Sequence, residues 1–352
     1  MSSPRVSVII PCYNLGRFVE EAIDSALGQT FQDIEILIID DGSTDPETQE
    51  VLSTCNRSRT RVLRTANQGL PAAKNVGIRN TTGAYLCALD ADDRLAPTML
   101  EQSVAVLDTE PSVAFVSHWL QNFGDDTSMW TPARCDFPAL LDVNTVNGAA
   151  LVRRSAVEAV GGFDETFRSG CEDWDFWISL TERGYAGRIL PEILFHYRRR
   201  PGSMSRVMLQ GEGHPSLYRR LIEKHRDTYE QHLGPLVVRR EQDISSLRRH
   251  IHDLELEHHR WLSPEVEKLR DDARLLGYRD ALGPVDQAEK EVAELRTDRR
   301  RLKHQLEAAL VRAGQARAEA DALRHSWSWK VTAPLRRAYD LLLRLQGTRR
   351  ST

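Results

Sequence analysis

The chain has 352 residues, 28% of them charged, and a formal net charge of −4 at pH 7. Single hydrophobic cores rarely grow past about 250 residues, so we expect one substantial domain and a further region. The nearly balanced charge does not indicate a nucleic-acid-binding protein, and we expect no nucleic acid among its partners. The five cysteines are odd in number and lack Cys-x-x-Cys spacing, which argues against a disulfide framework or a zinc site and fits a reducing cytosol.

The N-terminus runs directly into a strand-like segment, with no charged-then-apolar signal sequence. No window approaches the roughly 18 apolar residues that a membrane-spanning helix needs. We therefore expect a cytoplasmic protein that is soluble, or peripheral at the inner face of the cell membrane.

Short β-rich runs alternate with helical patterns along the first 118 residues. This alternation is typical of a mostly parallel sheet flanked by helices, so the predicted fold class is α/β. Residues 121–144 lose the pattern and indicate an irregular insertion. The predicted strands are 6–10, 34–39, 62–64, 85–89, 148–152 and 193–197, and the predicted helices are 15–27, 45–55, 72–79, 155–160 and 173–183.

Polar side chains follow three of the predicted strands, where open α/β sheets bind ligands. The sharpest cluster is Asp90, Asp92 and Asp93, which comes directly after the apolar run 85–89. Hard carboxylate oxygens suit a divalent cation, and such a cation can hold a diphosphate. An Asp-x-Asp-Asp sequence is also an ordinary polar turn, so this motif is weak evidence when taken alone.

Four segments, residues 6–14, 31–45, 67–75 and 89–97, together resemble the inverting, non-processive glycosyltransferases of family 2. Further along, residues 161–165 and 172–177 resemble that family's acceptor-side motifs. The resemblance covers about the first 205 residues in the correct order, which makes it much more specific than a single motif. It implies a GT-A fold, which is Rossmann-like with a mostly parallel sheet and flanking helices.

The resemblance also implies a donor site for a nucleotide-diphosphate sugar, with a UDP-sugar as the default, and Mg²⁺ or Mn²⁺ as cofactor. Asp92 would coordinate the metal, and Asp90 would support the metal or the ribose. Asp41 would contact the base, although it also suits a turn or a helix N-cap. The residues assigned to the nucleoside pocket are Pro11, Tyr13, Asn14, Asp40 and Asp41.

On the acceptor side, the resemblance makes Asp173 the general base that takes the proton of the attacking hydroxyl. Glu172 would orient the acceptor or its helix. Trp174 would either stack on a sugar face or fill the core, and Trp177 is expected in the core. A single base with no covalent nucleophile implies inversion of the anomeric carbon.

Two positions depart from the family pattern. Lys74 stands where the family usually has an arginine, so a phosphate or base contact and a solvated helix-face lysine both remain open. Arg200 stands where a metal-contacting histidine is common, and it would clamp the diphosphate directly and lessen dependence on a cation. His196 is expected to be a buried strand histidine.

Processive members of the family have a Gln-x-x-Arg-Trp segment, which is missing after Asp173, so we expect one sugar to be added per encounter. The expected acceptor is a glycan or a lipid-linked molecule in cell-surface polysaccharide or glycolipid synthesis. A sugar-1-phosphate nucleotidylyltransferase would need a Gly-rich loop after the first strand, where residues 11–14 read Pro-Cys-Tyr-Asn. The remaining alternative is a coiled-coil scaffold protein that carries a non-catalytic nucleotide-sugar-binding domain.

The predicted domains are a GT-A domain at 1–205, a helical linker at 206–237, coiled-coil helices at 238–325 with a break near 261–284, and a basic amphipathic tail at 326–352. Heptad spacing in the third region predicts a homo-oligomer, with an antiparallel hairpin within one chain as the alternative. The tail's tryptophans and arginines predict contact with a membrane surface, or else a cap on the coil.

Overall fold

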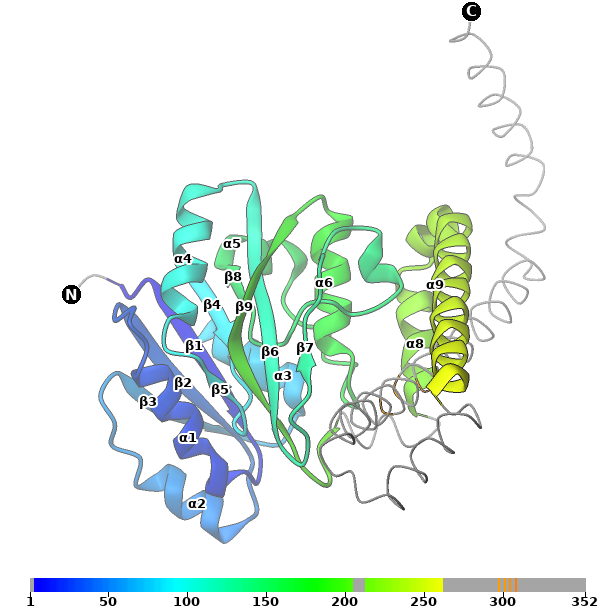
Figure 1. Cartoon of the computed structure of the whole chain (residues 1–352). Helices are drawn as coiled ribbons and strands as arrows, with labels where there is room; N and C mark the ends of the chain where they lie inside the picture. Colours follow the sequence, from blue (N-terminus) through cyan, green and yellow to red (C-terminus); the bar gives the residue numbers. More distant parts are fainter. Residues whose placement is uncertain are drawn as a thin grey trace, which may run out of the picture. The chain divides into compact units, whose positions relative to one another are not determined.

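A nine-stranded mixed sheet lies at the centre of the first of two units, Met1–Tyr229 and Glu230–Thr352. This computed structural model describes residues 3–204 and 213–261 and the single positions 297, 301, 304 and 308. Across that described part the strand order is β3-β2-β1-β4-β8-β6-β9-β5, with β7 paired to β6 (Figure 1).

In the first half of the unit, the observed bounds of most elements are close to the predicted ones. The strands are β1 Val6–Cys12, β2 Ile34–Asp41, β3 Thr60–Thr65, β4 Tyr85–Ala88, β5 Arg94–Leu95, β6 Val113–Gly124, β7 Met129–Trp130, β8 Leu151–Arg153 and β9 Ala186–Arg199. The helices are α1 Gly16–Leu27, α2 Pro46–Ser53, α3 Leu70–Arg79, α4 Met99–Thr109, the 3₁₀ turn η1 Ala139–Leu141, α5 Arg154–Val160, α6 Glu172–Glu182, α8 Gly213–Lys224 and α9 Arg226–Trp261.

The predicted α/β class is confirmed. Strands β1 to β4 pair with one another in parallel, and β8 lies between β4 and β6 and runs antiparallel to both. The sheet is therefore parallel in its first half and mixed in its second. Parallel strands place their carboxyl ends at one edge, which is where the candidate site lies.

Strand β1 is buried on both faces of the sheet. Val8 and Ile10 belong to the core that α1 and α4 cover, whereas Ile9 points the other way, against Gly77 of α3. This two-sided burial explains why β1 is mostly apolar, with Ser7 as its one hydroxyl side chain.

Gly77 permits the close approach of α3 to β1. A Cβ at this position would lie 2.2 Å from Cγ2 of Ile9, a buried, branched side chain with little freedom to move. We expect Gly77→Ala to lower the free energy of unfolding by about 1–3 kcal/mol, measured by chemical denaturation. Gly148→Ala is the matched control, because a Cβ added there would have no other atom within 4 Å. In an Ile9→Ala background, Gly77→Ala should lower the free energy of unfolding by less. If the effects of the two changes simply added, a clash between the new Cβ at position 77 and Ile9 would be ruled out.

The second half of the unit departs from the predicted pattern at β9, which begins at Ala186 and not near residue 193. Its pairing with β6 shifts register around Pro191 and Glu192, where Leu190 pairs with His118 and Ile193 with Trp119. Proline has no N–H for the ladder, so this irregularity interrupts the alternation that would have predicted a long strand. The stretch expected to be irregular, 121–144, contains the end of β6, β7 and η1.

Helix α8 belongs to the first unit, and the 36-residue helix α9 runs from Arg226 to Trp261. The domain boundaries given above, and the oligomer they imply, remain predictions. The second predicted coiled-coil run and the tail at 326–352 lie outside the described residues, except for the four single positions. No helix in the described part of the chain is both long and apolar enough to cross a bilayer.

Candidate active site

The ends of β1 and β2 lie side by side, with Cys12 in register with Asp40. Asn14, which has a left-handed φ of 54°, joins the two loops that follow these strands. Its side-chain oxygen accepts hydrogen bonds from the N–H groups of Thr44 and Asp45 at 2.8 and 2.9 Å. Asn14 therefore holds the loops of the predicted nucleoside pocket together, and the side chain of Tyr13 beside it is 45% exposed.

Asp40 and Asp41 are both buried at the end of β2. Asp40 accepts a hydrogen bond from the N–H of Ser43 at 2.8 Å. The two oxygens of Asp41 accept from the N–H groups of Gln68 and Gly69, at 2.9 and 2.8 Å. Asp41 thus fastens the loop before α3, while the N-cap of α2 is Asp45. An ionised carboxylate has about four acceptor positions, so this role leaves capacity for a base contact.

The carboxylates of Asp90, Asp92 and Asp93 follow β4, as the sequence predicts. The Oδ1 atom of Asp90 is buried without a hydrogen-bond partner. Burial raises the pKa of Asp90 to about 6; the charges of Asp92 and Glu172 add to the rise, and Lys74 opposes it. Asp93 is fully buried; its Oδ1 accepts a hydrogen bond from the N–H of Arg198 at 2.7 Å, and its Oδ2 is also buried without a hydrogen-bond partner.

Two arginines from the end of β9 hold the loop that contains Asp92. The Nε of Arg200 lies 2.7 Å from Oδ2 of Asp92, and the Nε of Arg198 donates to the Asp92 carbonyl at 2.8 Å. The Arg198 guanidinium also lies over the rings of Phe18 and Phe123. Arg200 therefore sits beside the predicted metal ligand. Nothing in the sequence pattern singled out Arg198.

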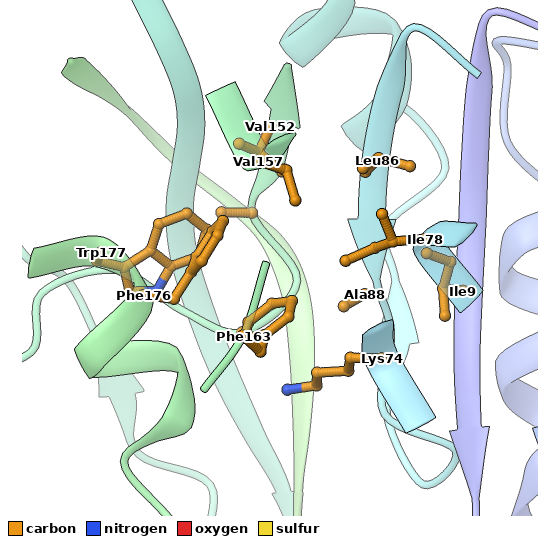
Figure 2. A pocket seen from close by; sticks show the side chains of 12 residues that line it. Ile9, Lys74, Ile78, Leu86, Ala88, Val152, Val157, Phe163, Phe176 and Trp177 are labelled. Carbon is orange, nitrogen blue, oxygen red and sulfur yellow. The ribbon is translucent and has the colours of Figure 1, made fainter. Parts of the chain in front are cut away.

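Lys74 is almost fully buried, at 2% exposure, and its Nζ lies 2.8 Å from Oε1 of Glu172. Figure 2 shows it extending from α3 past the ring of Phe163. Burial alone would lower the pKa of the Lys74 ammonium, but the charges of Glu172, Asp90 and Asp173 outweigh it and raise that pKa. The solvated-lysine alternative is thus wrong. The predicted phosphate or base contact stays a prediction.

Asp173 lies beside Glu172 in the first turn of α6. Its Oδ1 accepts from the N–H of Trp174 at 2.7 Å, and its Oδ2 accepts from Nδ2 of Asn144 at 3.2 Å. Burial raises the pKa of Asp173 to about 7; the charge of Glu172 adds to this, while Lys74 opposes it. A carboxyl that titrates near neutrality suits a general base. Asn144 gave no sequence signal, because it ends a stretch without periodicity.

Trp174 is buried, and its Nε1 donates to the carbonyl of Leu140 at 2.6 Å. Its ring lies 5.5 Å from that of Tyr218 in α8. Of the two roles open for Trp174, this packing supports the core role. The stacking contact on the acceptor stays a prediction. Trp177 is 2% exposed and packs against Phe115 and Phe176, so its predicted core role is confirmed.

A small apolar cavity of about 20 Å³ lies behind Lys74 (Figure 2). Side chains of β1, β4, β8, α3, α5 and α6 line it, including Ile9, Leu86 and Trp177. A cavity of this volume has room for about one water molecule, so it is too small for a nucleotide sugar.

The residues present fit a cation that is shared with a diphosphate. Among the described residues, no group of three His, Cys, Asp or Glu side chains could hold a metal. Asp90 nevertheless offers a buried oxygen without a partner, next to Asp92. Mg²⁺ is commonly bound by one or two carboxylates together with substrate phosphates, which matches this small donor set.

A buried charge network joins α6 to the segment that links α8 and α9, and sequence reasoning did not find it. The ring of His225 bonds Glu182 through Nδ1 at 2.8 Å and Asp175 through Nε2 at 3.0 Å. Lys224 bonds Asp175 and Asp164, both at 2.8 Å. A ring that faces two carboxylates through both nitrogens is favoured in its charged form.

Burial alone would lower the pKa of His225, but the hydrogen bonds and charges of Asp175 and Glu182 raise it above 6.5. Its contribution to stability is therefore fully present below pH 6.5, the unfolded pKa, and is lost as pH rises through the folded pKa. We expect the stability difference between wild type and His225→Gln to shrink as pH rises, by about 1.4 kcal/mol for each unit of the shift. Urea unfolding across this pH range measures it, and a constant difference would contradict a charged His225.

The chain is similar in sequence and in fold to known proteins. The profile of the family described as "Glycosyl transferase family 2" matches residues 7–161. An uncharacterized glycosyltransferase of Bacillus subtilis, EpsJ, is 29% identical over 221 residues, which is 58% of this chain and 64% of that protein. A chondroitin synthase of Escherichia coli is 30% identical over 188 residues, or 51% of this chain and 27% of that protein.

Among solved structures, the crystal structure of S. aureus TarS 1–349 in complex with UDP-GlcNAc superposes with a TM-score of 0.50. It is 20% identical, and the match covers 57% of this chain and 60% of that one. At this identity the likeness bears on the fold alone, and it confirms the predicted GT-A fold. The chain spans less than two thirds of the length of each of these three proteins. Residues 7–161, within the first unit, are thus similar to glycosyl transferase family 2.

Proposed function

We propose that this chain is an inverting, metal-dependent glycosyltransferase that moves a sugar from a nucleotide-diphosphate sugar to a hydroxyl of a glycan or lipid-linked acceptor. The observation that carries this proposal is the juxtaposition, around Lys74, of Asp173 with the Asp90–Asp92 pair. A proton acceptor that titrates near neutrality thereby stands next to carboxylates suited to a cation and a diphosphate.

In this mechanism the acceptor hydroxyl oxygen attacks the anomeric carbon and its proton passes to Asp173. The bond between that carbon and the β-phosphate oxygen breaks, and the nucleoside diphosphate leaves with the electron pair. One displacement inverts the anomeric centre, and no covalent intermediate is needed. Burial and the charge of Glu172 raise the pKa of Asp173 to about 7, while Lys74 opposes the rise, so the carboxyl is partly ionised near neutral pH and can accept the proton.

On the donor side, the base and ribose would lie among four residues, Pro11, Tyr13, Asn14 and Asp41. Asp92 and Asp90 would hold the cation, which would neutralise charge that builds on the leaving diphosphate. The Nε of Arg200 lies 2.7 Å from Oδ2 of Asp92, so its guanidinium would offer a second positive group to the diphosphate.

Polysaccharide synthesis is the proposed setting. The chondroitin synthase is a relative by sequence, and TarS, which shares the fold, was crystallised with UDP-GlcNAc. A UDP-sugar is therefore the first donor to test. The homo-oligomer, the membrane contact through residues 326–352 and the location at the inner membrane face remain predictions.

Thermal melting with UDP, GDP, dTDP and CDP, each with and without Mn²⁺, tests the proposal. We expect one nucleotide to raise Tm in a Mn²⁺-dependent way, because a ligand at about 100 times its Kd adds roughly 2.7 kcal/mol of stability. Asp92→Asn should abolish the Mn²⁺-dependent part. Asp24→Asn makes the same chemical change on a side chain that is 58% exposed, and it should behave as wild type.

Each other result has a definite meaning. A rise in Tm with a nucleotide that does not depend on Mn²⁺ would mean that Arg200, and not a cation, binds the diphosphate. No effect from any nucleotide, combined with no sugar transfer, would favour the scaffold alternative.

A further inference from the structure

Asn144 lies outside helix α6 and donates a hydrogen bond to the carboxylate of Asp173. The amide Nδ2 of Asn144 donates to Oδ2 of Asp173 at 3.2 Å, while the N–H of Trp174 occupies Oδ1. The side-chain oxygen of Asn144 accepts from the N–H of Val146 at 3.1 Å, and this contact sets which end of the amide faces Asp173. Both carboxylate oxygens of Asp173 therefore have one fixed donor each.

The turn that precedes Asn144 is fastened by three side chains from three helices. Trp174 of α6 donates to the Leu140 carbonyl at 2.6 Å. Tyr229 of α9 and Tyr218 of α8 both donate to the Leu141 carbonyl, at 2.9 and 3.4 Å. Leu140 and Leu141 are themselves fully buried, so the turn has little freedom to move. Helix α8 and the start of α9 thus support a loop that reaches the base.

Apart from the N–H of Trp174, the other groups that act on Asp173 are charged. Lys74 of α3 favours the ionised carboxylate, whereas Glu172 of α6 and Asp90 after β4 disfavour it. Asn144 is a neutral donor to the oxygen Oδ2, which the backbone of α6 does not hold. A hydrogen bond to the charged form of a carboxyl favours that form and fixes the direction of its free lone pairs.

We propose that Asn144 is a positioning residue for Asp173, and that Trp174, Tyr218 and Tyr229 hold the turn that carries it. The inference rests on the proposed function, in which Asp173 accepts the acceptor's proton. Proton transfer would then depend on a residue in the loop before β8. It would also depend on helices that lie beyond the stretch matched by the family profile.

The test is a pH titration of Asp173 in the full-length protein labelled with ¹³C at the aspartate carboxyl carbons. The Asp173 resonance is assigned by its loss in Asp173→Asn. In Asn144→Ala we expect the pKa of Asp173 to rise by about one unit, since a hydrogen bond to a charged group is worth more than one to a neutral group. Tyr229→Phe removes a single hydroxyl from the turn and should shift the pKa in the same direction by less.

Asn80→Ala is the matched control, because Asn80 lies at the end of α3 with its amide on the Val76 carbonyl, and it should leave the titration unchanged. An Asp173 pKa in Asn144→Ala equal to that of wild type would overturn the proposal, even if the variant were less stable. The titration needs neither donor nor acceptor. A failure of the proposed sugar transfer therefore appears in the assays above and leaves this result unaffected.

Discussion

Asp173→Asn is expected to lower kcat for sugar transfer by about 10²- to 10⁴-fold, the usual contribution of a positioned general base. Asparagine has the same shape, and its side-chain oxygen can still accept from the N–H of Trp174, so the fold and donor affinity should persist. Because the pKa of Asp173 is raised to about 7, wild-type kcat should rise with pH through about that value. The variant's residual rate should lose this dependence.

Steady-state kinetics across pH, with donor affinity measured separately by nucleotide titration, check this expectation. Asp24→Asn again supplies the same chemical change on the surface and should keep the wild-type profile. An unchanged kcat in Asp173→Asn would assign the proton to another group. Loss of nucleotide affinity together with activity would instead mean that Asp173 supports the donor site.

Lys74→Met is expected to lower the free energy of unfolding by about 3–5 kcal/mol, the usual cost of removing one partner from a buried ion pair. The change leaves Glu172 buried without its 2.8 Å partner, and it removes the cation that offsets Asp90 and Asp173. Methionine matches the lysine stem and keeps the packing against Phe163. The loss would therefore be chiefly one of charge.

Chemical denaturation measures this effect, and Glu172→Gln added to Lys74→Met should recover part of the loss, because the unpaired charge is then gone. Lys224→Met is the matched control. Its ion pairs are more exposed, with the Lys224 side chain at 35%, and its removal should cost less. If Lys74→Met kept wild-type stability but lost nucleotide affinity, the phosphate contact implied by the family resemblance would be its main role.

Most of the first half of the fold could be predicted from local pattern. The runs that became β1, β2 and β4 are largely buried and mostly apolar, interrupted by Ser7 in β1 and Glu35 in β2, and polar residues mark where each ends. Parallel strands bring those ends to one edge of the sheet. The order of the strands along the chain therefore predicted that Asn14, Asp41 and Asp92 lie near one another.

The later elements were harder to predict, because local pattern is weak there. The ladder between β6 and β9 shifts register at Pro191, and η1 lies in a stretch with no hydrophobic period, so neither left a regular signal. Arg198 and Asn144 act through partners that are distant in sequence. Their residue types alone do not distinguish them from surface polar residues.

The sequence by itself determined the α/β class, the family and the edge of the sheet where the site lies, because strand burial and chain order are local properties. Only the tertiary structure decided that Lys74 turns inward to Glu172, 98 residues away, and that Arg200 lies on Asp92. It also decided that Asn144 reaches Asp173. Long polar side chains have many rotamers, and which partner they meet is selected by packing between segments that no local pattern relates.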